Sequence, residues 1–239
     1  MSAPLLLAHS SDLHIGDVET TRAFAGDALG PLSFVLEAAQ AARADALLLA
    51  GDVFDNNRVP RALALAAARL LAAAGRPVVV LPGNHDPLVE DGVWRLAALN
   101  APDNVFVLAP GRRRKAQFPA LGFEVWGNAH TDYDDMVPLR SPVRRAAPIQ
   151  VAMAHGHFVP EPDRRKSPRP AWLIGRDEIV ATGADYVALG HWNRATAVAG
   201  GAVAAHYSGS PELVSTVNLV TLQQGRAPAV RAFAPGSGR

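Results

Sequence analysis

The sequence predicts an α/β fold in which two sheets pack against each other beneath covering helices. In the first half, short apolar runs that end in polar residues alternate with alanine- and leucine-rich segments of helical spacing. This βαβαβ pattern implies parallel strands joined by right-handed crossovers. In the second half, short apolar runs dominate and helical segments are few, which indicates additional strands. No break in composition divides the chain, so we expect one domain over residues 1–239.

The first half supplies three strands and two helices. Strands are expected at residues 4–9, 46–50 and 77–81, and each is followed at once by polar residues. Helices are expected at 32–43 and 60–74. Pro60 is acceptable in the first turn of the second helix, and Gly75 suits its end.

The second half supplies mostly strands. A short helix is expected at 176–181, and the proline-rich, charged stretch 160–170 is expected to be an exposed loop. The predicted strands are 105–108, 123–126, 149–154, 186–189, 203–207, 217–222 and 229–233.

Composition limits the chemistry of the chain. Of its 239 residues, 49% are hydrophobic and 19% charged, as in ordinary globular proteins. There is no cysteine, so disulfides and thiolate metal sites are excluded, and any metal must be held by nitrogen and oxygen atoms. The apolar run 5–8 is too short for a signal peptide, and no run approaches the ~20 residues of a membrane span, so we expect a soluble, cytoplasmic protein.

Positive charge is clustered although the net charge is only +1. The three clusters are Arg112 to Lys115; Arg140, Arg144 and Arg145; and Arg164, Arg165, Lys166 and Arg169. Such runs are either solvated loops or a surface that follows the phosphates of a nucleic acid.

The informative polar residues stand directly after the predicted strands. Ligands gather beyond the carboxyl ends of strands in open α/β sheets, so these side chains should meet at one edge. Imidazole and carboxylate groups suit manganese, iron and zinc, and two such ions can clamp the oxygens of a phosphoryl displacement. The residues are Asp12 and His14; Asp52; Asn84 and His85; His155; and His191.

These motifs resemble, in order, those of the calcineurin-like metallophosphoesterases. They read Asp-Leu-His from Asp12, Gly-Asp-Val-Phe-Asp from Gly51, Gly-Asn-His-Asp from Gly83, a strand-end His155, and Gly-His from Gly190. The text around them, such as His-Ser-Ser-Asp-Leu-His-Ile-Gly and Tyr-Ser-Gly-Ser-Pro-Glu, is similar to SbcD-type DNA repair nucleases. The likeness runs from about residue 5 to residue 220.

The resemblance implies a four-layer αββα sandwich that holds two divalent metal ions, with Mn²⁺ expected and iron or zinc as alternatives. By position, Asp12 and His14 would bind the first metal, Asp52 would bridge both, and the second metal would take Asn84, His155 and His191. His85 would protonate the leaving alkoxide or hold the phosphate, and Asp55 would orient its ring.

Some assignments stay open at this point. His157 could be the ligand instead of His155, which is favoured because it directly follows the apolar strand. Trp192 adjoins a predicted ligand and is either a packing residue or a wall of the substrate cleft; we assign it, with Arg58, to substrate binding. The family usually continues Gly-His-x-His, whereas this chain has Asn193 at the second histidine, so the affinity of the first metal is in question.

We expect a metal-dependent phosphodiesterase acting on DNA. The rival hypotheses are a phosphoesterase of the same fold acting on small phosphoesters, and a non-catalytic binding module. SbcD-type nucleases usually carry a DNA-capping region and a segment that docks an ATPase subunit, and the sequence ends at Arg239, soon after the last predicted strand. The resemblance therefore implies an SbcC-like ATPase partner, and the lack of the docking segment counts against it.

Overall fold

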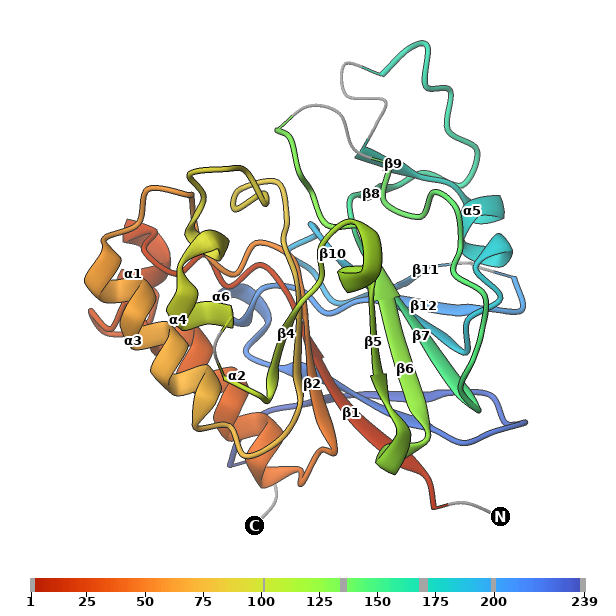
Figure 1. Cartoon of the computed structure of the whole chain (residues 1–239), viewed down its shortest axis with the longest axis horizontal. Coiled ribbons are helices and arrows are strands. Elements are labelled where there is room, and N and C mark those ends of the chain that lie inside the picture. Colours follow the sequence, from red (N-terminus) through yellow and green to blue (C-terminus); the bar gives the residue numbers. More distant parts are fainter. Residues whose placement is uncertain (1–2, 101, 134–136, 168–171, 199–200, 237–239) are drawn as a thin grey trace.

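Two six-stranded sheets form the centre of the structure, and helices lie on their outer faces (Figure 1). This computed structural model describes residues 3–100, 102–133, 137–167, 172–198 and 201–236. The layers follow one another as helix, sheet, sheet, helix, so the predicted four-layer αββα sandwich is confirmed.

The first sheet has the strand order β14-β13-β1-β2-β3-β4. Strands β1 to β4 are parallel, β13 is antiparallel to β1, and β14 is antiparallel to β13. The parallel strands therefore place their carboxyl ends at one edge. The strands are β1 (Leu5–Ser10), β2 (Ala46–Ala50), β3 (Val78–Leu81), β4 (Val105–Val107), β13 (Val217–Leu222) and β14 (Ala229–Phe233).

The second sheet has the strand order β11-β12-β10-β7-β6-β5. Its four inner strands are parallel, and β5 and β11 are antiparallel edge strands. The strands are β5 (Lys115–Phe118), β6 (Phe123–Gly127), β7 (Ile149–His155), β10 (Tyr186–Gly190), β11 (Thr196–Val198) and β12 (Ala204–Tyr207). A separate two-stranded sheet pairs β8 (His157–Phe158) with β9 (Leu173–Ile174).

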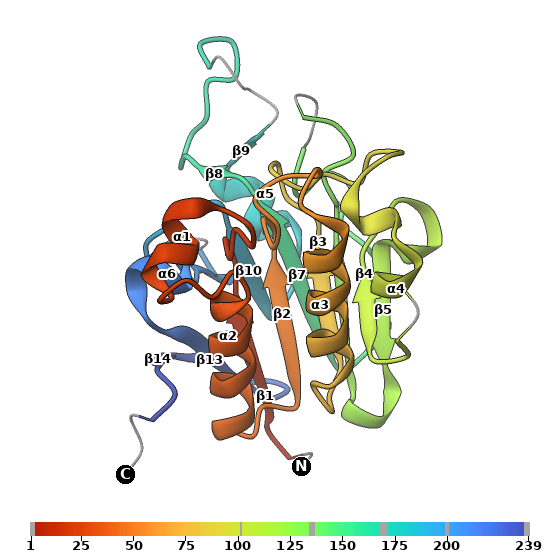
Figure 2. The same ribbon diagram turned by 90° about the vertical axis from the view of Figure 1, so that its left-hand side faces the viewer.

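Most helices cover the outer face of the first sheet, as Figure 2 shows from that side. They are α1 (Val18–Ala23), α2 (Gly30–Ala41), α3 (Arg61–Ala72), α4 (Ala97–Asn100) and α6 (Pro211–Val214). The second sheet is covered by α5 (Arg176–Ala181) and by loops. The 3-10 turns are η1 (Val93–Arg95), η2 (Gly111–Arg114) and η3 (Pro119–Leu121). Within the described residues, no helix has the length and apolar character needed to cross a membrane.

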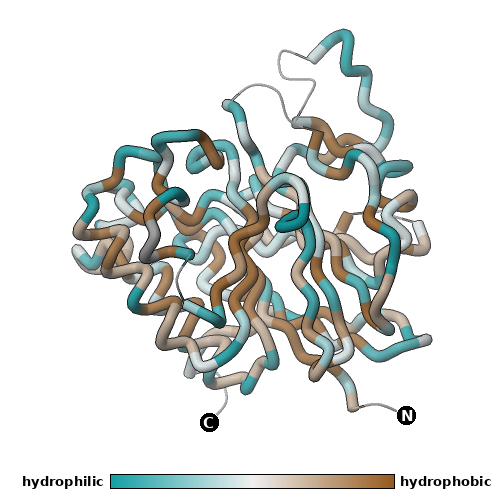
Figure 3. The backbone as a smooth tube through the Cα atoms, viewed as in Figure 1, coloured by the Kyte–Doolittle hydropathy of each residue, from teal (hydrophilic) through white to brown (hydrophobic). Residues whose placement is uncertain are grey.

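The inner strands are apolar on both faces because both faces are covered. In β2, Leu47 and Leu49 point into the core beneath the helices, whereas Leu48 points into the core between the sheets. In β10, Tyr186 faces the same inter-sheet core and Val187 faces the outer core under α5. Figure 3 shows the hydrophobic residues concentrated in these central strands. Three apolar layers thus hold four layers of secondary structure together.

The elements that the sequence did not predict are short or polar. Helix α1 has little apolar periodicity and is started by Asp17, whose side chain accepts a hydrogen bond from the Thr20 amide at 2.8 Å. Strand β5 begins inside the first basic cluster, where the charged sequence indicated a loop. It forms because it pairs with β6 along four residues and because Lys115 meets the buried Glu124 at 3.0 Å.

Candidate metal centre and active site

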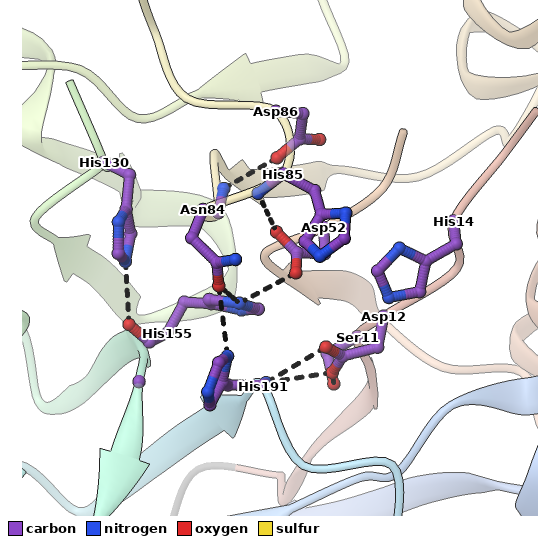
Figure 4. Close-up of polar contacts among 12 residues, drawn as sticks. Ser11, Asp12, His14, Asp52, Asn84, His85, Asp86, His130, His155 and His191 are labelled. Atoms are coloured by element: carbon purple, nitrogen blue, oxygen red, sulfur yellow. Dashed lines mark hydrogen bonds and ion pairs between the residues drawn. The ribbon is translucent and has the colours of Figure 1, made fainter. Parts of the chain in front are cut away.

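The polar residues that follow the strands meet where the carboxyl ends of both sheets come together (Figure 4). From the first sheet, the loop after β1 brings Asp12 and His14, the loop after β2 brings Asp52, and the loop after β3 brings Asn84 and His85. From the second sheet, His155 ends β7 and His191 follows β10. The site therefore depends on the packing of the two sheets, because neither supplies all of its groups.

Two groups of nitrogen and oxygen atoms converge in this place. In one, atoms of His14, Asp52 and His85 lie within 4.8 Å of one another, and in the other, atoms of Asp52, His155 and His191 do so. Asp52 belongs to both groups. A carboxylate shared in this way is the arrangement expected of a group that bridges two metal ions.

His155 is oriented by the backbone of the neighbouring sheet. Its Nδ1 lies 2.8 Å from the carbonyl oxygen of Ala50, and because a carbonyl only accepts, Nδ1 carries the proton. The other nitrogen, Nε2, lies 3.1 Å from Oδ2 of Asp52 and 2.9 Å from Oδ1 of Asn84, and both oxygens are acceptors. A metal ion bound between these groups would take the place of the Nε2 proton. A backbone carbonyl behind the ring is the usual support of a metal-binding histidine.

His157 lies outside this cluster. It is exposed, and its Nδ1 accepts a hydrogen bond from the indole of Trp192 at 2.9 Å. Of the two histidines left open by the sequence, the structure places His155 among the other predicted ligands.

Asn84 and Asp12 complete the cluster. Oδ1 of Asn84 faces both Nε2 of His155 and Nδ1 of His191, the latter at 3.0 Å. The carboxylate of Asp12 accepts the backbone amide of His191 at 3.0 and 3.2 Å and the hydroxyl of Ser11. The Ser11 hydroxyl is itself 2.9 Å from the hydroxyl of Ser208, which ties this part of the site to the loop after β12.

The backbone is strained where the predicted ligands stand. Within the described part of the chain, eight non-glycine residues have positive φ, and four of them are Asp12, His14, Asp52 and His191, with φ of 56°, 45°, 52° and 101°. Such conformations cost on the order of 1–3 kcal/mol each, and they concentrate at functional sites. Half of these strained residues therefore serve to aim side chains of the site.

The charges of the site are strongly coupled. Burial alone would raise the pKa of Asp52, but the attraction of His155, His14 and His85 holds that pKa well below its usual range. Burial lowers the pKa of His155, but the nearby Asp52 carboxylate raises it more, to about 9. Burial and the repulsion of His155 lower the pKa of His191 to about 3. The site thus combines a firmly ionised carboxylate with a neutral imidazole, and both are competent ligands.

His85 stands at the exposed side of the cluster, with 46% of its side chain exposed. Its Nδ1 lies 2.9 Å from the carbonyl oxygen of Asp55 and 3.7 Å from the Asp55 carboxylate. The backbone of Asp55, rather than the predicted carboxylate, makes the closer contact that orients the ring. The loop that carries this carbonyl is anchored to the loop after β1, because the amide of Asp55 donates to the carbonyl of Ile15 at 3.1 Å.

Asp86 is a site residue for which the sequence suggested no role. It is fully buried and accepts the amides of Val53 and Phe54 at 3.0 Å and of Gly83 at 2.8 Å, so it joins the loops after β2 and β3. Burial, and then repulsion from Asp52, raises the pKa of Asp86 to about 8. Its position at the end of the Gly-Asn-His-Asp motif was the signal that could have marked it.

Glycines line the same loops because side chains would not fit. A methyl group at Gly51 would overlap the ring of His155, one at Gly83 would overlap the carboxylate of Asp52, and one at Gly190 would overlap the carbonyl of Ala50. These glycines allow the three loops to approach closely enough for the ligand atoms to meet.

The two residues predicted to bind substrate, and the predicted metal ligand Asn193, lie further out. Trp192 stacks on Tyr207 and lines a cavity together with Asn193, which is exposed. Arg58 is exposed on the loop after Asp55, and its backbone amide is bonded to Asn56 at 2.8 Å.

The basic clusters are partly used by the fold. Each gives at least one cation to an internal contact: Arg114 with Asn128 at 2.6 Å, Arg145 with Asp185 at 2.7 Å, and Arg164 with Glu178 at 2.8 Å. Arg112 and Arg113 are exposed on η2, which follows the carboxyl end of β4 on the site edge of the first sheet. Arg169 lies outside the described residues.

The donor set fits divalent ions. Carboxylate, amide and imidazole groups converge from five segments, and the chain has no cysteine to favour a thiolate site. His155 has the supporting carbonyl that a ligand histidine needs, and Asp52 is placed to serve two ions.

Comparison with known proteins agrees with this geometry. The family model described as calcineurin-like phosphoesterase matches residues 5–195. Among solved structures, TT1561 of Thermus thermophilus superposes with a TM-score of 0.60 at 15% identity, covering 96% of this chain and 99% of that one, which shows a shared fold.

Three curated relatives are similar over much of the chain. The SbcD component of the nuclease SbcCD of Escherichia coli K12 is 28% identical over 94% of this chain, and its namesake in Bacillus subtilis is 24% identical over 86%. The uncharacterized metallophosphoesterase YhaO of Bacillus subtilis is 29% identical over 66%. The matches span 66%, 61% and 38% of the length of these relatives, respectively.

Proposed function

This chain belongs to the calcineurin-like phosphoesterase family and is a metal-dependent hydrolase, and from that premise we propose that it cleaves phosphodiester bonds of DNA with two Mn²⁺ ions. The similarity to two nuclease components supports DNA as the substrate. The oxygen and nitrogen donors suit manganese, and iron and zinc are the alternatives.

One observation carries the proposal: Asp52 is common to both groups of converging ligand atoms. We assign Asp12, His14 and Asp52 to one ion, and Asp52, Asn84, His155 and His191 to the other. When bound, a pair of such ions polarises a phosphate and activates a water molecule.

The side chains of the protein supply proton transfer and positioning. The Nδ1 proton of His85 is held by the carbonyl of Asp55, which leaves Nε2 free to face the substrate. In the doubly protonated ring, Nε2–H can give its proton to the leaving oxygen, and the ring becomes the neutral tautomer with its proton on Nδ1. Asp86 keeps the loops of Asp52 and His85 in register through three backbone amides. His85 thus places proton transfer at the exposed mouth of the site, where a phosphate can enter.

Asn193 is proposed as a weak ligand of the first ion. Its amide oxygen is neutral and is a poorer donor than the imidazole usual at this position in the family. We therefore expect one ion to be held tightly and the other to be lost first on dialysis. Titration calorimetry should show that Asn193→His tightens the weaker site. Two equally tight sites, unchanged by the substitution, would remove Asn193 from the metal centre.

A small phosphoester is the second candidate substrate, and the internal contacts of Arg114, Arg145 and Arg164 favour it. These contacts leave fewer cations for a nucleic acid backbone than the sequence suggests. The names of the nuclease relatives also support an SbcC-like ATPase as a partner, which co-purification from cells would test.

Turnover of two substrates tests the proposal. Single-stranded DNA and bis-p-nitrophenyl phosphate are incubated with the protein, with manganese or with excess chelator. The proposal expects hydrolysis of both substrates with manganese and of neither with chelator. Hydrolysis of the small diester alone would transfer the assignment to the second candidate, and full activity in chelator would refute the two-metal mechanism.

A further inference from the structure

A cavity of about 530 Å³ lies beside the candidate metal centre. It is lined by His157, His191, Trp192, Asn193, Arg194 and Thr196. Its volume lies in the range of about 300–1,000 Å³ that small-molecule sites usually have. These six residues include an aromatic ring, a cation and small polar groups, and no carboxylate, so the lining favours an anionic ligand with a flat ring.

The wall formed by Trp192 is rigid. Its ring lies parallel to that of Tyr207, with centroids 4.4 Å apart and an angle of 8° between the planes, and its indole donates to Nδ1 of His157 at 2.9 Å. Tyr207 is fixed in turn, because its hydroxyl donates to the carbonyl of Gly156 at 2.7 Å and accepts the amide of Phe158 at 2.8 Å. One face of the indole is therefore covered, and the cavity meets its other face or its edge.

His191 belongs to both the cavity and the cluster of predicted ligands. Its ring lines the cavity, while its Nδ1 lies 3.0 Å from Oδ1 of Asn84. A molecule in the cavity is thus one side chain away from the place where a phosphate would be cleaved.

We propose that this cavity binds the nucleobase of the nucleotide whose phosphate lies at the metal centre. The proposal rests on the proposed function, since it assumes a phosphodiester at Asp52. Stacking on an aromatic ring accepts any base, because every base has a π-face. Thr196 can hydrogen-bond the base edge, and Arg194 can meet the next phosphate of the strand.

The test compares substrates with and without a base. The p-nitrophenyl esters of thymidine 5′-phosphate and thymidine 3′-phosphate are each compared with the ester of the same sugar phosphate lacking thymine. The two isomers place the base on either side of the cleaved phosphate, so the test detects base binding in both strand directions. The readout is the ratio of kcat/KM for the base-bearing ester to that for the base-free ester. A ratio cancels differences in metal loading and in the folded fraction between variants.

Trp192→Ala should lower this ratio about 5- to 140-fold for at least one isomer, the equivalent of about 1–3 kcal/mol of stacking at 1.4 kcal/mol per tenfold. Trp192→Phe should restore most of it. Phe106→Ala, which removes a partly buried aromatic ring on β4, the edge strand of the first sheet away from β13 and β14, should leave the ratio unchanged. A Trp192→Ala ratio within twofold of wild type for both isomers would overturn the proposal while leaving the phosphodiesterase assignment intact.

If no ester is hydrolysed, the proposed function is contradicted, and equilibrium binding then tests the base-binding cavity separately. The affinities of thymidine 5′- and 3′-monophosphate are compared with those of the base-free sugar phosphates in wild type and Trp192→Ala. A preference for the base that Trp192→Ala removes supports the cavity assignment. Equal affinities with and without the base would refute it.

Discussion

Replacing Gly51 with alanine is expected to damage the candidate metal centre far more than its size suggests. Gly51 follows the last residue of β2 and directly precedes Asp52, and it has φ +95°. A Cβ there would lie within 2.9 Å of the Cβ of His155 and closer still to its ring. The ring has to move, and it then loses the bond from Nδ1 to the carbonyl of Ala50.

Gly26 provides a matched control for this substitution. It has φ +89°, and a Cβ at Gly26 would meet no atom within 4 Å. Both alanines bear the backbone strain of positive φ, about 1–2 kcal/mol. Gly51→Ala adds overpacking of about 1–3 kcal/mol and a lost hydrogen bond of about 0.5–1.5 kcal/mol. We therefore expect it to be about 2–4 kcal/mol less stable than Gly26→Ala.

Urea unfolding with chelator and with manganese measures both consequences. In chelator, the difference in unfolding free energy between the two variants should have the stated size. A ligand at 100 times its Kd adds about 2.7 kcal/mol of stability, so wild type and Gly26→Ala should gain on adding manganese, whereas Gly51→Ala should gain little. Equal stability of the two variants, with equal gains from manganese, would refute the proposed packing of His155 against this loop.

The acid histidine, a buried histidine and the exposed arginines each yield a further prediction. His85→Ala should keep its metals and lose about 10²–10⁴-fold in turnover of DNA. The loss should be smaller with a nitrophenolate leaving group, which needs little protonation. Equal losses in the two steady-state assays would count against the acid role. Burial and the nearby His206 lower the pKa of His9 to about 3. Below pH 6.5 this histidine is therefore protonated in the unfolded chain but stays neutral in the folded chain. Protonation of this group should lower the free energy of unfolding by about 2 kcal/mol between pH 6.5 and 5, and His9→Asn should flatten the dependence of that free energy on pH, measured by urea unfolding. An unchanged slope would show that His9 is protonated in the native state. Changing Arg112 and Arg113 to glutamine should reduce the slope of log K against log salt for single-stranded DNA binding by about 1.4. The same change at the exposed Arg43 and Arg226, at the opposite edge of the first sheet, should leave that slope unchanged. Equal slopes for the two double variants would exclude η2 from the interface.

The fold was predictable because its inner strands are short, apolar and ended by polar residues. No comparable signal marks β5, which starts at Lys115 in a basic run and becomes a strand through pairing with β6. Helix α1 also escaped prediction, because it is held by the Asp17 cap and by a bond from Thr20 to Glu212 at 2.9 Å rather than by an apolar stripe.

The candidate site was predictable as a set of residue types but not as a geometry. Asp12, Asp52 and His191 follow strands, and parallel strands bring their carboxyl ends together. The contacts of Arg145 with Asp185, or of Trp192 with His157, join residues 35 or more positions apart and depend on how the sheets pack. For the same reason, the sequence could not show that the carbonyl of Asp55 orients His85, since a backbone contact leaves no mark in residue identity.

Asp52 is proposed to hold two metal ions at once, and a count of bound metals tests this bridging role most directly. Wild type and Asp52→Asn are loaded with manganese, freed of excess metal on a short desalting column, and measured for metal per chain by mass spectrometry. We predict two ions per chain in the wild type and none retained in Asp52→Asn, because the charge shared by both ligand groups is gone. Retention of as many ions per chain in Asp52→Asn as in the wild type would contradict the bridging role of Asp52.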